Sequence, residues 1–304
     1  MRPTLRQLQY IVAVADTGRF HEAAKRLHVS QPSLSAQIAE VEKQLDIQLI
    51  ERGRNGALMT PLGIEFVRRA RLILRDVEDL KSAMQVSDEA FAGRIRMGVL
   101  PSVGPYLLPP VVTDLHRSYP NLRLIIQEHW ADDLDRLIKE GALDCAISAP
   151  ENHKDLASEL LFEEPLWICT APDDPLAGQG AVPLEALRDR ELLSVGQSHR
   201  WNGTIEQLAE LAGAKMSGVF TGTSLDAIRH MSATGAGIAI LPAIYALAEA
   251  RRDADLVLRP LDHQLARRAV ALVWRPTSPL EPSFLKIAEI LQQDAKAILS
   301  ETGG

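Results

Sequence analysis

The chain has 304 residues, enough for two or three domains, and its 46% hydrophobic and 24% charged residues are typical of globular proteins. No apolar run is long enough to span a membrane, and the first residues lead directly into an amphipathic pattern, so we expect neither a membrane partner nor a signal peptide. Two cysteines are too few for a disulfide framework. Together these features predict a cytoplasmic protein.

The charge is unevenly distributed along the chain. The net charge of -7 argues against a nucleic-acid-binding protein if it is taken as a whole. However, residues 1–96 carry 15 Lys+Arg and 12 Asp+Glu, a net charge of +3, which leaves -10 for residues 97–304. A mildly basic N-terminal part is therefore joined to an acidic body. In a dimer, two such basic parts side by side would double the positive field.

Three helices are predicted within the first 45 residues, at about Thr4–Asp16, Phe20–Leu27 and Ser30–Leu45. A tight turn at His28 separates the second helix from the third. Two helices joined by such a short turn form a helix-turn-helix unit. We expect His28 to pack or cap in this turn rather than to bind a ligand.

The third predicted helix has an unusual N-terminus. Ser30 is suited to cap it, and Pro32 lies in the first turn, where a missing N–H costs nothing. Four apolar residues at helical spacing form its buried stripe: Leu34, Ile38, Val41 and Leu45. The opposite face begins with short, uncharged polar side chains, which suit a helix that enters a DNA groove and contacts base edges. A well-capped surface helix is the alternative.

A small hairpin is predicted between Asp46 and Thr60, because turn residues separate two short apolar segments there. Its tip carries Arg52 and Arg54. Beside a helix-turn-helix, such a hairpin forms a wing whose arginines can reach phosphates or the minor groove. In another setting it would be a solvated loop.

A long helix is predicted from Thr60-Pro61 to about Ser87. Its apolar residues are spaced alternately by four and three positions, which is a heptad pattern, and its other faces are strongly charged. Such a helix requires a partner helix, so we predict that it mediates dimerisation. The predicted dimer seam consists of Phe66, Ala70, Ile73, Val77, Leu80 and Met84.

Strands alternate with helices after a polar linker at 87–93, and this pattern predicts a parallel α/β body. Predicted helices end near Leu115, cover 134–140 and lie at the C-terminus. The predicted strands are 95–100, 122–128, 143–148, 166–170, 192–195, 218–221, 237–242 and 269–274. No internal repeat is present.

The order of these elements, and above all the segment Phe20–Ser35, resembles the LysR-type transcriptional regulators over essentially the whole chain. Within that family the body is similar to the OxyR-type peroxide sensors. The segments that carry this second similarity are Val103–Pro109, Leu143–Cys145, Thr223–Leu225, Gly235–Ile238, Leu241–Ala243, Arg275–Pro276 and Ser278–Leu280.

The resemblance implies an α/β fold with an all-α winged helix-turn-helix head, a long dimerisation helix and a two-lobed effector domain of the periplasmic-binding-protein type. The expected domains are 1–60, 61–92 and 93–304, with lobe I at about 93–163 and 268–304 and lobe II at about 164–267. Strands crossing near 163–168 and 262–268 would form the hinge. The implied partners are promoter DNA, a small effector, further copies in a homodimer or homotetramer, and RNA polymerase, with no cofactor.

Several residues depart from the family pattern. OxyR-type sensors carry a reactive cysteine after a Gly-His pair, but here Arg200 follows His199, and no second cysteine follows downstream. A dithiol switch of that kind is therefore excluded. Ala36 stands where many relatives have arginine, and Arg54 is shifted by one place from the wing arginine of the family. The base preference of relatives is therefore not expected to carry over to this chain. Ala131 removes a hydroxyl that many relatives place in the cleft.

For DNA, the expected contacts combine base edges read from the third helix with phosphate or groove contacts from the helix and the wing. The predicted DNA-binding residues are Gln31, Pro32, Ser33, Ser35, Gln37, Arg52 and Arg54. We expect Ser30 to cap the helix rather than to read DNA.

For the effector, Ser102, Val103 and Gly104 lie where a strand ends and a helix begins, so free amides and a hydroxyl could hold an anion. Ligands of doubly wound folds collect at strand carboxyl ends, which adds further candidates. These are Trp130, Ser148, His199, Trp201 and Thr223. The alternatives are that the tryptophans are core residues, that Ser148 simply ends a strand and that His199 is structural.

Cys145 and Cys169 lie in apolar strands and are expected to be buried and inert. An oxidative-stress regulator that senses through these thiols, or through an oxidant bound near Ser102 and His199, is the alternative function. An enzyme is not expected, because the sequence has no nucleophile elbow, phosphate loop or His-Glu-x-x-His motif and its histidines show no metal-ligand spacing.

Overall fold

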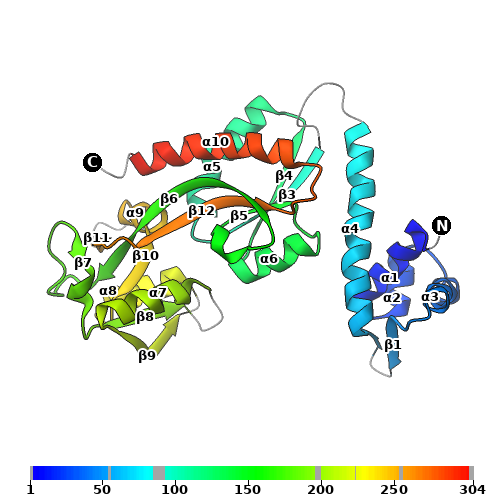
Figure 1. Cartoon of the computed structure of the whole chain (residues 1–304), viewed down its shortest axis with the longest axis horizontal. Coiled ribbons are helices and arrows are strands. Elements are labelled where there is room, and N and C mark those ends of the chain that lie inside the picture. Colours follow the sequence, from blue (N-terminus) through cyan, green and yellow to red (C-terminus); the bar gives the residue numbers. More distant parts are fainter. Residues whose placement is uncertain are drawn as a thin grey trace. The chain divides into compact units, whose positions relative to one another are not determined.

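A computed structural model describes residues 3–53, 56–84, 93–195, 200–222, 224–252 and 256–300 (Figure 1). The chain divides into two compact units. The first contains Met1–Gly93 with Lys139–Ala142, and the second contains Arg94–Ile138 with Leu143–Gly304. Among the described residues, no helix is both long enough and apolar enough to cross a membrane.

Three short helices form the head of the first unit, as predicted: α1 (Leu5–Thr17), α2 (Phe20–Arg26) and α3 (Gln31–Leu45). α1 ends at Gly18, whose φ of 65° is a left-handed conformation that glycine adopts without strain. His28, between α2 and α3, also has a positive φ of 54°, and this left-handed backbone conformation forms part of the turn between the two helices. Apolar residues from all three helices share one core.

The predicted wing is present as an antiparallel hairpin of β1 (Ile50–Gly53) and β2 (Gly56–Met59). It is held to α3 by Glu42, whose Oε1 accepts backbone N–H bonds from Leu49 and Ile50 at 2.8 and 3.0 Å. α4 (Pro61–Met84) follows directly. A Cβ at Gly63, in its first turn, would lie 2.1 Å from the Leu49 carbonyl oxygen, so only glycine allows this close approach.

The second unit is built on an eight-stranded sheet of order β4-β3-β5-β12-β6-β11-β7, with β10 paired to β6 as well. β3 and β5 are parallel, whereas β12 is antiparallel to both β5 and β6. The strands are β3 (Gly93–Val99), β4 (Leu122–Glu128), β5 (Cys145–Ser148), β6 (Ala157–Thr170), β7 (Val182–Pro183), β10 (Ala239–Pro242), β11 (Val257–Asp262) and β12 (Arg267–Trp274).

β6 belongs to both halves of this unit, as Figure 1 shows. Residues 157–165 pair with β12, whereas residues 166–170 pair with β10 and β11. We call the half around β3, β4 and β5 lobe I and the half around β10 and β11 lobe II. Lobe I carries the helices α5 (Gly104–Ser118), α6 (Ala131–Lys139) and α10 (Glu281–Ser300).

Lobe II adds the parallel strands β8 (Glu191–Val195) and β9 (Lys215–Gly222). Its helices are α7 (Arg200–Ala212), α8 (Leu225–Ala233) and α9 (Ala243–Ala250). Each lobe has its own core, and in lobe II buried residues of β8, β10 and α7 pack together. The cavity described below lies between the two lobes.

The prediction of a parallel α/β body holds only in part. β3–β5 and β8–β9 are parallel, but β6 and β12 run antiparallel because each crosses between the lobes. The predicted strand at 166–170 covers only the second half of β6. The first half escaped prediction because its large apolar residues form one run, 160–162, between two pairs of polar residues, so apolar and polar residues do not alternate along it.

Candidate functional site

The exposed face of α3 is the first candidate site. Ser30 caps the helix by accepting the Ser33 amide at 3.3 Å, as the sequence predicted. Leu34, Ile38 and Val41 are buried and fix which face turns outward. The predicted DNA-reading residues occupy the opposite face: Gln31, Pro32, Ser33 and Gln37 are exposed, and Ser35 is half-buried.

Sequence reasoning missed Gln7, a buried glutamine on α1. Its Nε2 donates to Oε1 of Gln37 at 3.1 Å and so connects α1 to the exposed face of α3. The signal was available as a Thr-x-x-Gln capping box at the start of α1. Of the wing arginines, Arg52 lies in β1 opposite Ala57, whereas Arg54 lies outside the described residues.

The predicted dimer seam on α4 divides into two parts. Phe66 packs against the core of the head in its own chain, and Ala70 is buried. Ile73 is 46% exposed and Leu80 is 61% exposed, so these two seam positions present apolar surface. Val77 is half-buried, and the side chain of Met84 lies outside the described part of the chain. The exposed part of the predicted seam therefore lies in the second half of α4; outside the seam, Leu62 and Ile64 in the first turn are exposed as well.

A cavity of ≈ 270 Å³ between the lobes is the second candidate site. Lobe I, lobe II and the crossover strand β12 all contribute to its wall. The residues that line it include Ser102, Trp130, Ala131, Asp132, Glu151, Trp201, Thr204, Gln207, Arg267 and Arg268. Both acidic and basic side chains are present, so the cavity is polar but not dominated by one sign of charge.

Arg268 is the central polar residue of this cavity, although it is buried. Its Nη1 donates to the Ser102 hydroxyl at 2.9 Å, and its Nε donates to Oε1 of Glu164 at 2.9 Å. The guanidinium carbon lies 5.3 Å from the ring centroid of Trp201, within cation–π range. Oε2 of Glu164 accepts the backbone N–H of Ile244 in the first turn of α9 at 2.8 Å. One arginine therefore connects lobe I, both crossover strands and lobe II.

Sequence reasoning missed Arg268 as well. A pair of arginines directly before an apolar strand is a weak signal. The arginine pair becomes informative only once the fold is known, because β12 crosses between the lobes and so places Arg268 in the cavity wall.

The predicted anion seat on free helix amides was wrong. The backbone N–H groups of Val103 and Gly104 both donate to the Leu100 carbonyl at 2.9 Å, and that of Leu107 donates to the Val103 carbonyl. These amides are therefore occupied by the chain itself. Val103 and Gly104 are buried and do not line the cavity. The positive charge beside Ser102 comes from Arg268 instead.

Ser148 was also misassigned to the cavity. It is fully buried, and its Oγ lies 2.8 Å from Nε2 of His153, whose Nδ1 lies 3.2 Å from a carboxylate oxygen of Asp135. The order serine, histidine, aspartate is that of hydrolase triads. Here the hydroxyl is inaccessible to a substrate, so this chain of contacts ties the end of β5 to α6.

The remaining predicted effector residues divide into two groups. Trp130 and Trp201 line the cavity as predicted. The indole N–H of Trp201 is buried and has no hydrogen-bond partner among the described residues, so the ring contributes its face rather than a donor to the site. His199 and Thr223 lie outside the described residues.

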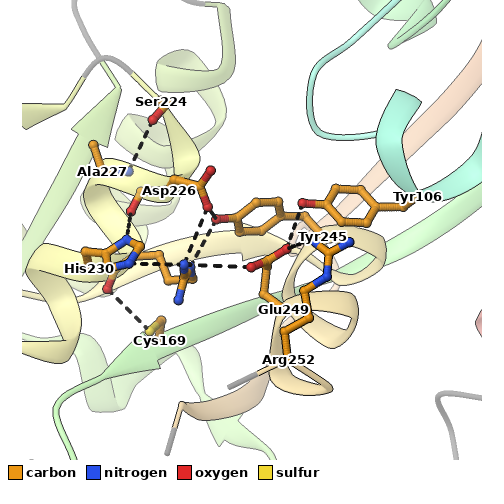
Figure 2. A network of polar contacts seen from close by, with 10 residues as sticks. Tyr106, Cys169, Ser224, Asp226, Ala227, His230, Tyr245, Glu249 and Arg252 are labelled. Atoms are coloured by element: carbon orange, nitrogen blue, oxygen red, sulfur yellow. Dashed lines mark hydrogen bonds and ion pairs between the residues drawn. The ribbon is translucent and has the colours of Figure 1, made fainter. Parts of the chain in front are cut away.

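A second polar network joins the lobes (Figure 2). The Tyr106 hydroxyl, on α5 of lobe I, donates to Oε1 of Glu249 on α9 of lobe II at 3.1 Å. The rings of Tyr106 and Tyr245 meet edge to face at 5.7 Å. Arg252 donates to the same Glu249 oxygen at 2.9 Å. Burial and then the Glu249 carboxylate raise the pKa of Tyr106, which keeps its hydroxyl protonated as the donor.

Both cysteines are fully buried. Burial raises the pKa of the Cys145 thiol well above its ordinary value, and the neighbouring Asp144 carboxylate adds to this effect. The sulfur of Cys169 lies 4.0 Å from the Arg229 carbonyl oxygen in the interior of lobe II. A protonated, inaccessible thiol is a poor nucleophile toward oxidants.

Two family models together match most of the chain. Residues 5–64 match the bacterial regulatory helix-turn-helix protein of the lysR family, and residues 88–296 match the LysR substrate binding domain. The DNA-binding transcriptional dual regulator OxyR of Escherichia coli K12 is 36% identical over 289 residues, which cover 95% of this chain and 94% of that protein.

Solved structures are similar as well. Full-length OxyR from Pseudomonas aeruginosa, a point variant, superposes with a TM-score of 0.75 at 30% identity and covers 95% of this chain and 97% of its own. A cysteine-to-serine mutant of Corynebacterium glutamicum OxyR with H2O2 bound gives 0.65 at 28% identity and covers 99% and 95%. The chain therefore belongs to the LysR family of bacterial transcriptional regulators.

Proposed function

We propose that this LysR-type regulator binds promoter DNA through α3 and the wing, and that a small effector in the interlobe cavity controls it. The observation that carries the effector site is the bond between Ser102 and Arg268, which places two donors from different parts of the domain at one cavity wall. These donors favour a small molecule that carries hydrogen-bond acceptors, such as a carboxylate.

For DNA recognition, we propose that the α3 residues contact base edges and phosphates and that the wing arginines contact the backbone or the minor groove. The exposed, uncharged N-terminal face of α3 supports this assignment. The assigned residues are Gln31, Pro32, Ser33, Ser35, Gln37, Arg52 and Arg54. Members of the family act as dimers or tetramers, and we place the dimer contact on the second half of α4, with RNA polymerase as the further partner.

Hydrogen peroxide is the second candidate effector, because several relatives are peroxide-inducible activators by name and one similar structure contains H2O2. In this chain no thiol faces the cavity, since Cys145 and Cys169 are buried elsewhere. We therefore propose that, if peroxide acts here, it acts as a ligand hydrogen-bonded to Ser102 and Arg268 rather than as an oxidant of cysteine.

A thermal-shift panel of small mono- and dicarboxylates, phosphate and hydrogen peroxide tests this function. We expect at least one compound to raise the Tm of the wild type and to lose most of that effect in Ser102→Ala. Ser158→Ala is the matched control, because Ser158 is exposed on β6 away from the cavity lining. An equal shift in all three proteins would contradict the assigned site.

The double variant Cys145→Ala/Cys169→Ala tests whether a thiol senses peroxide. The measurement is the peroxide-dependent change in the promoter footprint. We expect any response of the wild type to persist in the double variant. Loss of the response there, with the fold intact by circular dichroism, would show that a thiol senses the oxidant.

A further inference from the structure

The buried amide of Gln7 occupies an unusual position for a glutamine. Gln7 lies at the third position of α1 and is 3% exposed, although its helix begins at the surface. Glutamine side chains are mostly exposed in proteins, so a buried amide requires partners for its donor and acceptor groups. Those partners are Thr4 on one side and Gln37 on the other.

The hydrogen bonds at Thr4 fix the orientation of the Gln7 amide. The backbone N–H of Thr4 can only donate, and it lies 2.9 Å from Oε1 of Gln7; the Thr4 hydroxyl lies 3.1 Å from the same oxygen. Both lone pairs of Oε1 are thus engaged. The other terminal atom of Gln7 must be Nε2, a donor, and it faces Gln37 at 3.1 Å.

A donor on Gln7 in turn fixes the Gln37 amide. The Gln37 atom that meets Nε2 of Gln7 must be the carbonyl oxygen, Oε1. Gln37 is exposed on the outer face of α3, so its NH2 group is the end left to face outward. The orientation of both amides therefore follows from one backbone N–H whose chemistry is unambiguous.

We propose that Gln7 is a positioning residue for DNA specificity: by holding the Gln37 carbonyl, it makes Gln37 present hydrogen-bond donors to the major groove. This inference rests on the proposed contact of Gln37 with DNA. Guanine offers two acceptors and thymine one in that groove, whereas cytosine offers only an N4 donor. Adenine also offers an acceptor, N7, but its neighbouring N6 group is a donor that opposes the outward NH2 of Gln37, and the inward-turned carbonyl is not available for the bidentate pairing of glutamine with adenine. Gln37 therefore selects guanine or thymine at its base position.

The choice of glutamine at position 7 supports this role. A capping box accepts Glu or Gln at this position, and a negative charge there also interacts favourably with the helix dipole. For capping alone, Glu would serve at least as well. A carboxylate has no donor, however, so with Glu at this position Gln37 would turn over, donate its NH2 inward and present its carbonyl to DNA.

The test is site selection from a library of randomised DNA duplexes, using the full-length protein. At one base position in each half-site, the wild type should prefer guanine or thymine. Gln7→Glu should shift that preference toward adenine or cytosine by about tenfold, the usual size of one base contact. Gln9→Glu is the matched control, since it places the same charge on an exposed position of the same helix and should leave the selected site unchanged.

Two further variants separate the possible failures. Gln37→Ala should remove the preference at that one position; if the selected site is unchanged, the proposed DNA contact of Gln37 is wrong. If Gln37→Ala removes the preference but Gln7→Glu leaves it as in the wild type, the positioning role of Gln7 is refuted. If circular dichroism shows that Gln7→Glu does not fold, Gln7→Met is the deciding variant. A relaxed base preference at that position supports the positioning role of Gln7, and an unaltered base preference overturns it.

Discussion

Glu164 and Arg268 form a buried ion pair that organises the cavity wall. Glu164 is fully buried, and its two oxygens are divided between the Arg268 guanidinium and the Ile244 amide of α9. A buried pair of this kind adds little net stability compared with apolar residues, but removing one partner leaves an uncompensated charge. Its value for this protein is therefore positional: it holds the guanidinium against Ser102.

Glu164→Gln is expected to destabilise the protein by about 3 kcal/mol, because it leaves Arg268 charged and unpaired in the interior. Denaturant unfolding of the full chain, followed by circular dichroism, measures the change. Glu163→Gln is the control, since Glu163 is the exposed neighbour in the same strand and should alter stability by less than about 0.5 kcal/mol. A loss below 1 kcal/mol in Glu164→Gln would mean that the pair is not buried as described.

At the residue scale, sequence reasoning identified the cavity only in part. Ser102, Trp130 and Trp201 were predicted and do line it. Ser148 was wrongly assigned to the cavity because its hydroxyl instead contacts His153. The chain turns between these two residues, and no local sequence pattern reveals that contact. Arg268 was missed because its role depends on Glu164, 104 residues away along the chain.

At the scale of elements, α4 performs two tasks along its length. Its first half contributes to the core of the head, as Phe66 and Val67 show. Its second half exposes Ile73 and Leu80 between charged residues. An apolar stripe that continues beyond its own domain's core is the pattern of a helix that pairs with a second copy.

Leu80→Glu is expected to weaken self-association at least tenfold, because burying a carboxylate in an apolar helix pair costs more than the leucine contributed. Analytical ultracentrifugation over a range of protein concentrations gives the change in Kd. Asp76→Lys, a charge change on an exposed polar position of α4, should have little effect. Equal Kd values for Leu80→Glu and the wild type would place the dimer contact elsewhere.

Element prediction succeeded where the hydrophobic period was strong and failed where pairing partners decided the structure. The helices of the head follow from apolar spacing and from caps such as Ser30. By contrast, β11 and the helices α7, α8 and α9 of lobe II were not predicted. In α9 almost every residue is apolar or small, so no amphipathic stripe distinguishes it from a buried strand.

At the scale of the whole effector domain, two polar connections among the described residues link the lobes: Arg268 contacts both Ser102 and the Trp201 ring, and Tyr106 donates to Glu249. Ser102, Arg268 and Trp201 line the cavity, so a ligand that enters it acts on the first of these connections. Any effector that binds one arrangement of the lobes more tightly shifts the population toward that arrangement.

Tyr106→Phe is expected to loosen this connection while keeping the ring contact with Tyr245. A net hydrogen bond contributes about 0.5–1.5 kcal/mol, so amide hydrogen exchange in α9 should accelerate roughly two- to tenfold. Mass-spectrometric hydrogen exchange measures it peptide by peptide. Tyr10→Phe, in the head, should leave exchange in α9 unchanged, and unaltered α9 exchange in Tyr106→Phe would show that this bond does not restrain the lobes.

The continuous strand β6 limits what an effector can make the lobes do. Its pairing passes from β12 to β10 and β11 around Pro165, a residue with no N–H to donate, and β12 has a register shift at Val270/Ala271. The lobes therefore cannot slide or separate without breaking hydrogen bonds that β6 makes with β12, β10 or β11. They can twist about the strand at the point where the ladder is weakest. We therefore expect effector binding to turn lobe II about β6 rather than to move it along the strand.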